Sequence, residues 1–409
     1  MKVLFITLET YPVKTATGNC VMALIRELNR RQIRADVLNI TGDSALPEEL
    51  HSDGVTFYNV FDSRFSSFDQ LLKEHKLLAL KAAPQRLLHR FTKSDSGKAE
   101  AGQTVRLAVN RLKKIGLQYD YLIAVCSHYI NGMICDAYCK ETAKPFLVYQ
   151  LDPISTNQFF GLSDQMSEIE LALYSDARAI ITTPILAAEK QADPAYAALL
   201  PKVHPAEFPN VKDLTCADAP ASDGKQIECF YSGRFYGTMR DCTFPLEVLS
   251  RVQSEQLQVV FAGDGQEDRI ESYRGAFGER LRHLGMLPLD ESFRKMQEAD
   301  VLINIGNNVS NQVPSKLFDY ISTGKPILNF CKIPDCPTIP YVNRYRLGLN
   351  VIEGADTLEN QAHAVWQFID STRGARMRYE EIQTSFQENT AEYVGRLFAE
   401  LLTDGVGRG

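Results

Sequence analysis

The sequence of 409 residues lacks long hydrophobic runs and any clear cysteine pattern. No stretch of about 18 consecutive apolar residues occurs, so no segment has the length of a membrane-spanning helix. The nine cysteines include no Cys-x-x-Cys pair, and residues 1–9 turn acidic too early for a secretory signal. We therefore expect reduced thiols and a cytoplasmic protein. Peripheral attachment to the inner face of the plasma membrane stays open.

Catalytic and cofactor motifs of several enzyme classes are also absent. No Gly-x-Gly-x-x-Gly follows a predicted strand and no Walker Gly-x-x-x-x-Gly-Lys-Ser/Thr occurs, which argues against nicotinamide-dependent and ATP-hydrolysing enzymes. His-Glu-x-x-His and Asp-x-Asp, which would suggest a catalytic metal, are missing. So is the Gly-x-Ser-x-Gly of a hydrolase nucleophile. We expect neither a metal nor a bound cofactor.

Charge is distributed unevenly along the chain. The formal net charge of −7 argues against a general nucleic-acid-binding surface, so no nucleic-acid partner is expected. Residues 64–114 nevertheless hold twelve Lys or Arg against four Asp or Glu. This basic insert is either a solvated helical pair packed on the first domain or an amphipathic surface for anionic lipid or a lipid-diphosphate acceptor. The residues leave both interpretations open.

Apolar runs predict two successive sets of buried strands separated by helices. The first set is 2–7, 35–40, 121–125, 145–149 and 179–182, and the second is 227–231, 257–261, 281–284, 301–305 and 326–330. This alternation is typical of parallel α/β sheets. We predict two Rossmann-like domains that face a central ligand cleft. The expected boundaries are 1–208 with a basic helical insert at about 62–116, a proline-containing linker 209–226, a second domain 227–385 and a final helix 386–409.

The segment Asn311–Leu328 is the most informative part of the chain. It follows the predicted strand 301–305 and opens a short helix at Ser315. A helix that begins at the carboxyl end of a strand points backbone N–H groups at a phosphate. Lys316 adds a cation, and Asp319, one turn further, can accept from a sugar hydroxyl. The same pattern also suits a purely structural strand-loop-helix unit.

The run Pro314–Pro326 resembles the donor-site helix of GT-B glycosyltransferases. It is most similar to the large retaining, family 4-like group that includes bacterial capsule and lipopolysaccharide enzymes. There the position of Asp319 is normally Glu and holds the donor ribose, and a second Glu that meets the transferred sugar corresponds to Asn311. The resemblance implies a terminal helix that crosses back to the first domain.

The same resemblance implies a metal-independent glycosyltransferase of the hexosyltransferase type. Its donor would be a nucleotide-diphosphate sugar, a UDP-sugar in the first place, and its acceptor a glycan or lipid-linked sugar in surface polysaccharide synthesis. Transfer would retain the anomeric configuration, with the departing phosphate accepting the acceptor's proton on the same face.

Two arginines follow the first strand of the second domain, in Ser232–Arg240. Gly233 would let the backbone turn tightly there, and Arg234 and Arg240 would clamp the diphosphate together with Lys316 and the opening of the helix at Ser315. Relatives have Gly-Arg followed by Lys, so Arg240 replaces the second cation. Both arginines could instead be ordinary surface residues of a loop.

Further candidates are weaker. Gly18 and Asn19 correspond to the glycine-rich loop of relatives, in which backbone N–H groups approach donor or acceptor. His128 lies where relatives contact the donor sugar, although a lone histidine is more often structural. Asp152, at another strand end, binds acceptor hydroxyls or starts a turn. Met286 marks a segment whose backbone would bind the base.

Two other functions share this architecture. A non-catalytic GT-B subunit that stabilises an active partner would explain Asn311 and Asp319 in place of glutamates and the sparse glycine loop. A nucleotide-sugar 2-epimerase would need acid/base carboxylates beside the sugar, and the sequence shows no convincing set. We expect an enzyme rather than either alternative.

Overall fold

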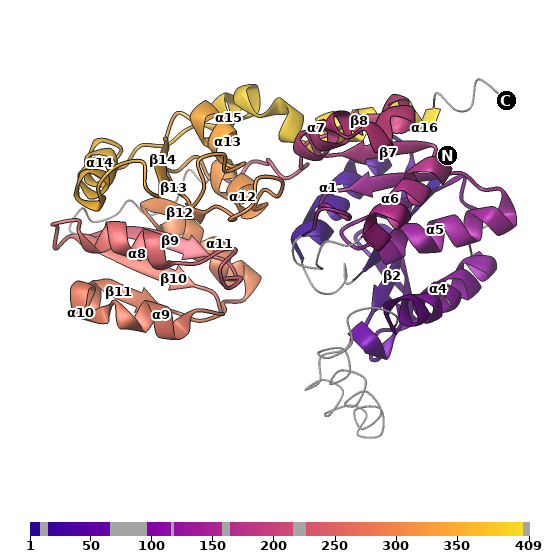
Figure 1. Ribbon diagram of the computed structural model, residues 1–409, viewed down its shortest axis with the longest axis horizontal. Helices are drawn as coiled ribbons and strands as arrows, with labels where there is room; N and C mark the ends of the chain where they lie inside the picture. Colours follow the sequence, from indigo (N-terminus) through magenta and orange to yellow (C-terminus); the bar gives the residue numbers. More distant parts are fainter. Residues whose placement is uncertain (9–14, 66–95, 116–117, 158–163, 216–225, 404–409) are drawn as a thin grey trace. The chain divides into compact units, whose positions relative to one another are not determined.

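The computed structural model describes residues 1–8, 15–65, 96–115, 118–157, 164–215 and 226–403 (Figure 1). The chain divides into two compact units: unit 1 is Met1–Pro209 with Ala391–Gly409, and unit 2 is Asn210–Thr390. Much of the predicted basic insert (66–95) and of the predicted linker (216–225) lies outside the described residues.

Unit 1 is built on an eight-stranded sheet. Its strands run in the order β3-β4-β2-β1-β5-β6-β7-β8, and all pairs are parallel except β3 with β4. The strands are β1 Lys2–Leu8, β2 Arg34–Thr41, β3 Glu49–Ser52, β4 Val55–Phe61, β5 Tyr121–Val125, β6 Phe146–Gln150, β7 Ala179–Thr182 and β8 Val203–Pro205. The helices are α1 Ala16–Arg30, α4 Ser96–Ile115, α5 Tyr129–Thr142, α6 Asp164–Asp176, α7 Pro184–Ala192 and α16 Ala391–Thr403.

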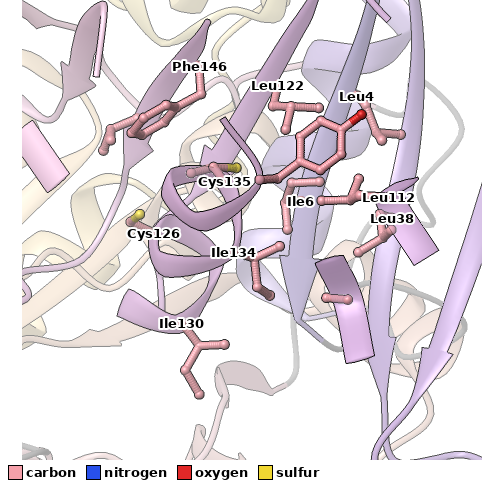
Figure 2. Packing of buried hydrophobic residues seen from close by; sticks show 14 of the residues in the cluster. Leu4, Ile6, Leu38, Leu112, Leu122, Cys126, Ile130, Ile134, Cys135 and Phe146 are labelled. Atoms are coloured by element: carbon pink, nitrogen blue, oxygen red, sulfur yellow. The ribbon is translucent and has the colours of Figure 1, made fainter. Parts of the chain in front are cut away.

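Alternate residues of the unit 1 strands serve two cores, because successive side chains of a strand point to opposite faces of the sheet. On one face Leu4 and Ile6 of β1 pack with Leu112 of α4 and Ile134 of α5, as Figure 2 shows. Their neighbour Phe5 is fully buried and belongs to the other set. Burial on both faces explains why these strands are continuous apolar runs in the sequence.

Helix α16 returns the chain to unit 1 and packs against α1 (Figure 1). Phe398 is fully buried, with its ring edge-on to Tyr149 of β6 at 5.1 Å between centroids. At Gly395 a Cβ would lie 2.5 Å from Cγ of Glu27 in α1, so the glycine allows the two helices to approach closely.

The final helix, predicted over 386–409, begins later in the structure, and a shorter helix precedes it. The chain here forms α15 Tyr379–Ser385, a 3-10 turn Gln387–Asn389 and α16, which begins at Ala391 rather than at 386. The break has a long-range cause: Thr390 is extended and forms a parallel β-bridge with Val211. A partner so distant in the sequence leaves no local signal.

Unit 2 is built on a six-stranded sheet in the order β11-β10-β9-β12-β13-β14, with all strands parallel. The strands are β9 Ile227–Ser232, β10 Leu257–Ala262, β11 Leu281–His283, β12 Val301–Ile305, β13 Ile327–Cys331 and β14 Gly348–Ile352. The helices are α8 Thr243–Ser250, α9 Glu267–Ser272, α10 Arg274–Phe277, α11 Leu289–Glu298, α12 Lys316–Ser322, α13 Ile339–Arg344, α14 Leu358–Ser371 and the α15 given above. Cys229 and Tyr231 of β9 share a core with Leu246 of α8 and Val365 of α14.

We predict that Phe398→Ala destabilises unit 1 by about 3–5 kcal/mol, because it opens a cavity where α16 covers the sheet. Chemical denaturation followed by far-ultraviolet circular dichroism measures the change in the free energy of unfolding. Tyr393→Ala is the matched control on the same helix, since this residue is 38% exposed, and we expect a cost below about 1 kcal/mol. Equal losses for both variants would contradict the packing of α16 described above.

Candidate functional site

The candidate residues of unit 2 lie where its strands end. All six strands are parallel, so their carboxyl ends lie along one edge of the sheet. Arg234 follows β9, Met286 follows β11, and Asn311 to Asp319 follow β12. The fold therefore brings to one edge residues that the sequence places far apart.

Arg234 is held by Asp264, which lies in the turn after β10. Its Nε and Nη2 donate to Oδ1 and Oδ2 of Asp264 at 2.9 and 3.0 Å. This bidentate pairing raises the pKa of Arg234. A planar guanidinium group can pair with a phosphate in the same bidentate way. Asp264 had no role in the sequence-based predictions, because its partner Arg234 lies on a different loop.

The tight approach expected at Gly233 depends on a different glycine. A Cβ on Gly263 would lie 1.8 Å from the carbonyl oxygen of Gly233, and the Gly233 N–H donates to Ala262 O at 2.9 Å. At Gly233 itself the nearest atoms to a Cβ belong to the side chain of Tyr231, with the hydroxyl oxygen at 3.0 Å. Gly263 is therefore the position at which any side chain would push the two loops apart.

Arg240 is oriented by an amide rather than by a carboxylate. Its Nε and Nη2 donate to Oδ1 of Asn307 at 3.0 and 2.7 Å, and its guanidinium lies 5.3 Å from the ring centroid of Tyr236. Asn307 in turn donates to Gln312 O at 2.9 Å. This chain of contacts joins the loop after β9 to the loop that leads into α12.

Helix α12 is fastened to β9 by the hydroxyl group of Tyr320. That hydroxyl accepts from Ser232 N at 2.9 Å and donates to Ser232 O at 3.1 Å. Tyr320 had no role in the sequence-based predictions. An aromatic residue with a hydroxyl on the buried face of a helix was the available signal, because buried hydroxyls require partners.

The N-terminus of α12 has fewer available backbone N–H groups than the sequence suggested. The helix has seven residues, Lys316–Ser322, and Ser315 makes no side-chain capping bond. Leu317 N and Phe318 N already donate to Pro314 O and Ser315 O at 3.0 and 3.1 Å. The expectation of a row of available N–H groups is corrected accordingly: a short helix with engaged amides contributes little, and any anion must be held chiefly by side chains.

Lys316 and Asp319 lie together, as predicted for neighbouring turns of a helix. Lys316 Nζ is 3.7 Å from Oδ2 of Asp319 and 5.3 Å from the ring centroid of Phe293 in α11. Burial raises the pKa of Asp319, although Lys316 and Lys212 act in the opposite direction. The carboxylate is thus enclosed yet has positive charge on two sides.

The remaining unit 2 candidates differ in exposure. Met286, after β11, is 59% exposed and follows Gly285, whose φ of +65° favours glycine. Asn311 is half-buried in the loop between β12 and α12. The roles of both residues in binding a donor remain predictions.

His128 lies at the carboxyl end of unit 1's sheet and caps α5. Its Nδ1 accepts from Ile130 N at 3.3 Å, and its ring stacks on Tyr129 at 4.7 Å between centroids. Burial lowers the pKa of His128 to about 4, so the imidazole is neutral at physiological pH. A neutral imidazole that accepts at Nδ1 carries its proton on Nε2 and can donate a hydrogen bond from there.

Gly18 and Asn19 do not lie in a loop, contrary to the prediction. Helix α1 already begins at Ala16, because Thr15 caps it: Gly18 N donates to Thr15 Oγ1 at 3.0 Å, and Asn19 N donates to Thr15 O at 2.9 Å. The N–H groups of these two residues therefore have partners inside the helix. The expected approach of their N–H groups to a phosphate is not supported.

Asp152 is half-buried in the loop after β6, which is held by an enclosed ion pair. Glu170 of α6 accepts from Lys190 Nζ at 3.0 Å, from Gln150 Nε2 at 2.9 Å and from Ser155 N at 3.3 Å. Burial pushes the pKa of Glu170 upward, but the charge of Lys190 and these hydrogen bonds outweigh it and lower the pKa. Gln150 and Ser155, on either side of Asp152, are thus bonded to the same buried carboxylate.

Two properties concern the described part of the chain as a whole. Within it, no group of three or more His, Cys, Asp or Glu side chains is arranged to hold a metal ion. None of its helices combines the length and the apolar character that crossing a bilayer requires.

Comparison with known proteins gives similar structures only. No protein-family model matches the sequence, and no curated protein matches it. Sucrose-phosphate synthase from Thermosynechococcus elongatus is similar over 100% of both chains, with 14% identity and a TM-score of 0.71. The apo form of the lipopolysaccharide outer core galactosyltransferase WaaB is similar over 99% of this chain and all of its own, with 12% identity and a TM-score of 0.63.

A substituted TarM from S. aureus, in complex with fondaparinux, α-GlcNAc-glycerol and UDP, is similar over 98% of this chain and 100% of its own. Its identity is 11% and its TM-score 0.62. At such identities the similarity shows the fold, and it covers both parallel-sheet units. The chain has the GT-B fold of glycosyltransferases.

Proposed function

We propose that this protein is a glycosyltransferase that moves a sugar from a nucleotide-diphosphate donor to a glycan or lipid-linked acceptor in surface polysaccharide synthesis. The donor diphosphate binds at the carboxyl edge of the unit 2 sheet. A UDP-sugar is the first candidate donor, and the TarM relative carries UDP in its structure.

One observation carries the proposal: positive side chains exceed carboxylates in the contacts at this edge. Arg234 is paired with Asp264, but Arg240 donates to the neutral Asn307. Asp319 is shared by Lys316 and Lys212. A diphosphate would find an excess of cations here, on groups that already present N–H donors in fixed positions.

The chemistry follows from that arrangement. When the bond between the sugar and the diphosphate breaks, negative charge grows on the leaving phosphate, and Arg234, Arg240 and Lys316 stabilise it without a metal. Asp319 accepts from ribose hydroxyls, and Asn311 faces the sugar. The leaving phosphate takes the proton of the attacking acceptor hydroxyl, so the new bond forms on the face from which the old one breaks. Retention and metal independence are part of the proposal.

His128 enters the proposal as a donor rather than as an acid. Its neutral ring offers Nε2–H to a hydroxyl of the sugar and does not change charge between pH 5 and 8, because its pKa lies near 4. Asp152 is the proposed acceptor-binding residue, on a loop that the Glu170–Lys190 pair fixes.

We predict that Lys316→Ala and Arg234→Ala each weaken binding of UDP or GDP by about ten- to a hundredfold, as expected for loss of a charged hydrogen bond to phosphate. Isothermal titration calorimetry with UDP, GDP and their sugars measures this, and sugar transfer by the double variant should fall further.

The chain provides matched controls for both variants. Lys295→Ala removes a lysine that is 22% exposed, against 24% for Lys316, and that pairs with Glu298. Arg274→Ala removes an exposed arginine paired with Glu271. Both controls should bind like the wild type. Sugar transfer at near wild-type rate in the Lys316/Arg234 double variant would overturn these roles, and absence of binding to every nucleotide would favour a non-catalytic subunit.

We predict that the His128 imidazole stays neutral down to about pH 5 and titrates near pH 4. Nuclear magnetic resonance of the ring nitrogens should show the Nε2–H tautomer. The unfolded chain protonates near its ordinary pKa of 6.5, so the unfolded state gains a proton first and folding stability is lost as the pH falls from 6.5 towards 4.

His128→Asn keeps a side-chain acceptor for capping α5 and removes the titration. It should remove the contribution of His128 to the pH dependence of stability between pH 4 and 6.5, whereas His204, whose pKa burial also lowers, keeps its own. A titration midpoint above pH 6 in the folded protein would contradict the assigned state of His128.

A further inference from the structure

Asp319 lies between two ammonium groups that come from different parts of the chain. Lys316 Nζ, on the same helix, is 3.7 Å from Oδ2, and Lys212 Nζ is 3.9 Å from Oδ1. Both ammonium groups also lie near the ring of Phe293, with centroid distances of 5.3 and 5.2 Å. Lys212 therefore belongs to the same cluster as Lys316, although no motif in the sequence indicates it.

The backbone places Lys212 firmly in this cluster. Residues 211–214, here called the entry segment, run past the end of α12. Lys212 N donates to Ser322 Oγ at 3.2 Å, and Leu214 N donates to Ser322 O at 3.2 Å. Gln297 of α11 donates to Leu214 O at 2.6 Å. Since Ser322 and Asp319 are three residues apart on one helix face, a lysine anchored at Ser322 has the length to reach Asp319.

The distances indicate what Lys212 does there. Both 3.7 and 3.9 Å exceed the usual length of a hydrogen bond, about 2.7–3.2 Å. The two cations therefore flank the carboxylate and act on its charge without filling the hydrogen-bonding positions of its oxygens. The groups that face Asp319 are Lys316 from α12, Lys212 from the entry segment and the neutral phenol of Tyr320.

We propose that Lys212 is a positioning residue of the nucleotide site, which holds the Asp319 carboxylate in the orientation that accepts from the ribose hydroxyls. This inference rests on the proposed function and adds to it a residue outside the helix that carries Asp319. Lys212 acts through Asp319 and does not itself bind the diphosphate. Asp319, positioned by Lys212, would recognise the vicinal diol of the nucleotide's ribose.

The test compares nucleotides with and without that diol. Dissociation constants of UDP, GDP and their 2′,3′-dideoxy counterparts are measured for the wild type, Lys212→Met and Lys212→Arg. We expect Lys212→Met to weaken UDP or GDP binding by about two- to fivefold, in the range of a partly exposed ion pair. Binding of the dideoxy nucleotides should stay unchanged, and Lys212→Arg should restore most of the loss.

Two further readouts separate positioning from a merely structural role. In the Asp319→Asn background, Lys212→Met should have no additional effect, as a double-mutant cycle shows. Loss of one flanking cation raises the pKa of a carboxylate, so the defect of Lys212→Met should deepen as the pH falls from 7.5 to 5.5. Lys295→Met is the matched control and should change nothing, and thermal unfolding should show each variant folded.

Other results overturn the inference. An equal loss for the ribose and dideoxy nucleotides would show that Lys212 acts on the diphosphate, and no loss for either would show that it has no part in binding. A wild-type protein that binds no nucleotide at all would instead remove the proposed function, and this inference with it.

Discussion

The arrangement of the unit 2 site depends on one hydroxyl group. Tyr320 both accepts from and donates to the backbone of Ser232, and so joins the helix that carries Lys316 and Asp319 to the strand that leads to Arg234. Burial raises the pKa of this phenol, which keeps it neutral and therefore able to do both. Without it, the polar groups of a buried strand end would lose their partners, which is costly in a protein interior.

Buried polar anchors of this kind also hold two loops that carry candidate residues. The loop with Arg240 is held through Asn307, and the loop with Asp152 through the enclosed Glu170–Lys190 pair. Lys325 is fully buried and donates to the carbonyl oxygens of Gln297 and Ala299, at the end of α11. Each anchor removes freedom from a loop whose side chains have to be in place before a ligand arrives.

The sequence predicted the fold well because both sheets are covered on two faces. Runs such as 301–305 are apolar throughout, and the structure confirms a strand there. The site was predicted less completely, since its contacts join distant segments. Gly18 and Asn19 were predicted to lie in a loop, whereas α1 already begins at Ala16. The capping bond from Gly18 N to Thr15 Oγ1 starts the helix there, and the residue types alone also suit a loop. Lys212 was missed because its partner Asp319 is on another element, and single residues carry no periodic signal.

The β-bridge between Val211 and Thr390 bears on how unit 2 could be exchanged during evolution. Val211 is the second residue of unit 2 and Thr390 is its last, so the segment that enters this unit and the segment that leaves it are neighbours. A unit whose ends meet can be exchanged as one piece, with a single pair of adjacent junctions to rejoin. Recombination could thus supply a different version of unit 2 while leaving the sheet of unit 1 and helix α16 as they are.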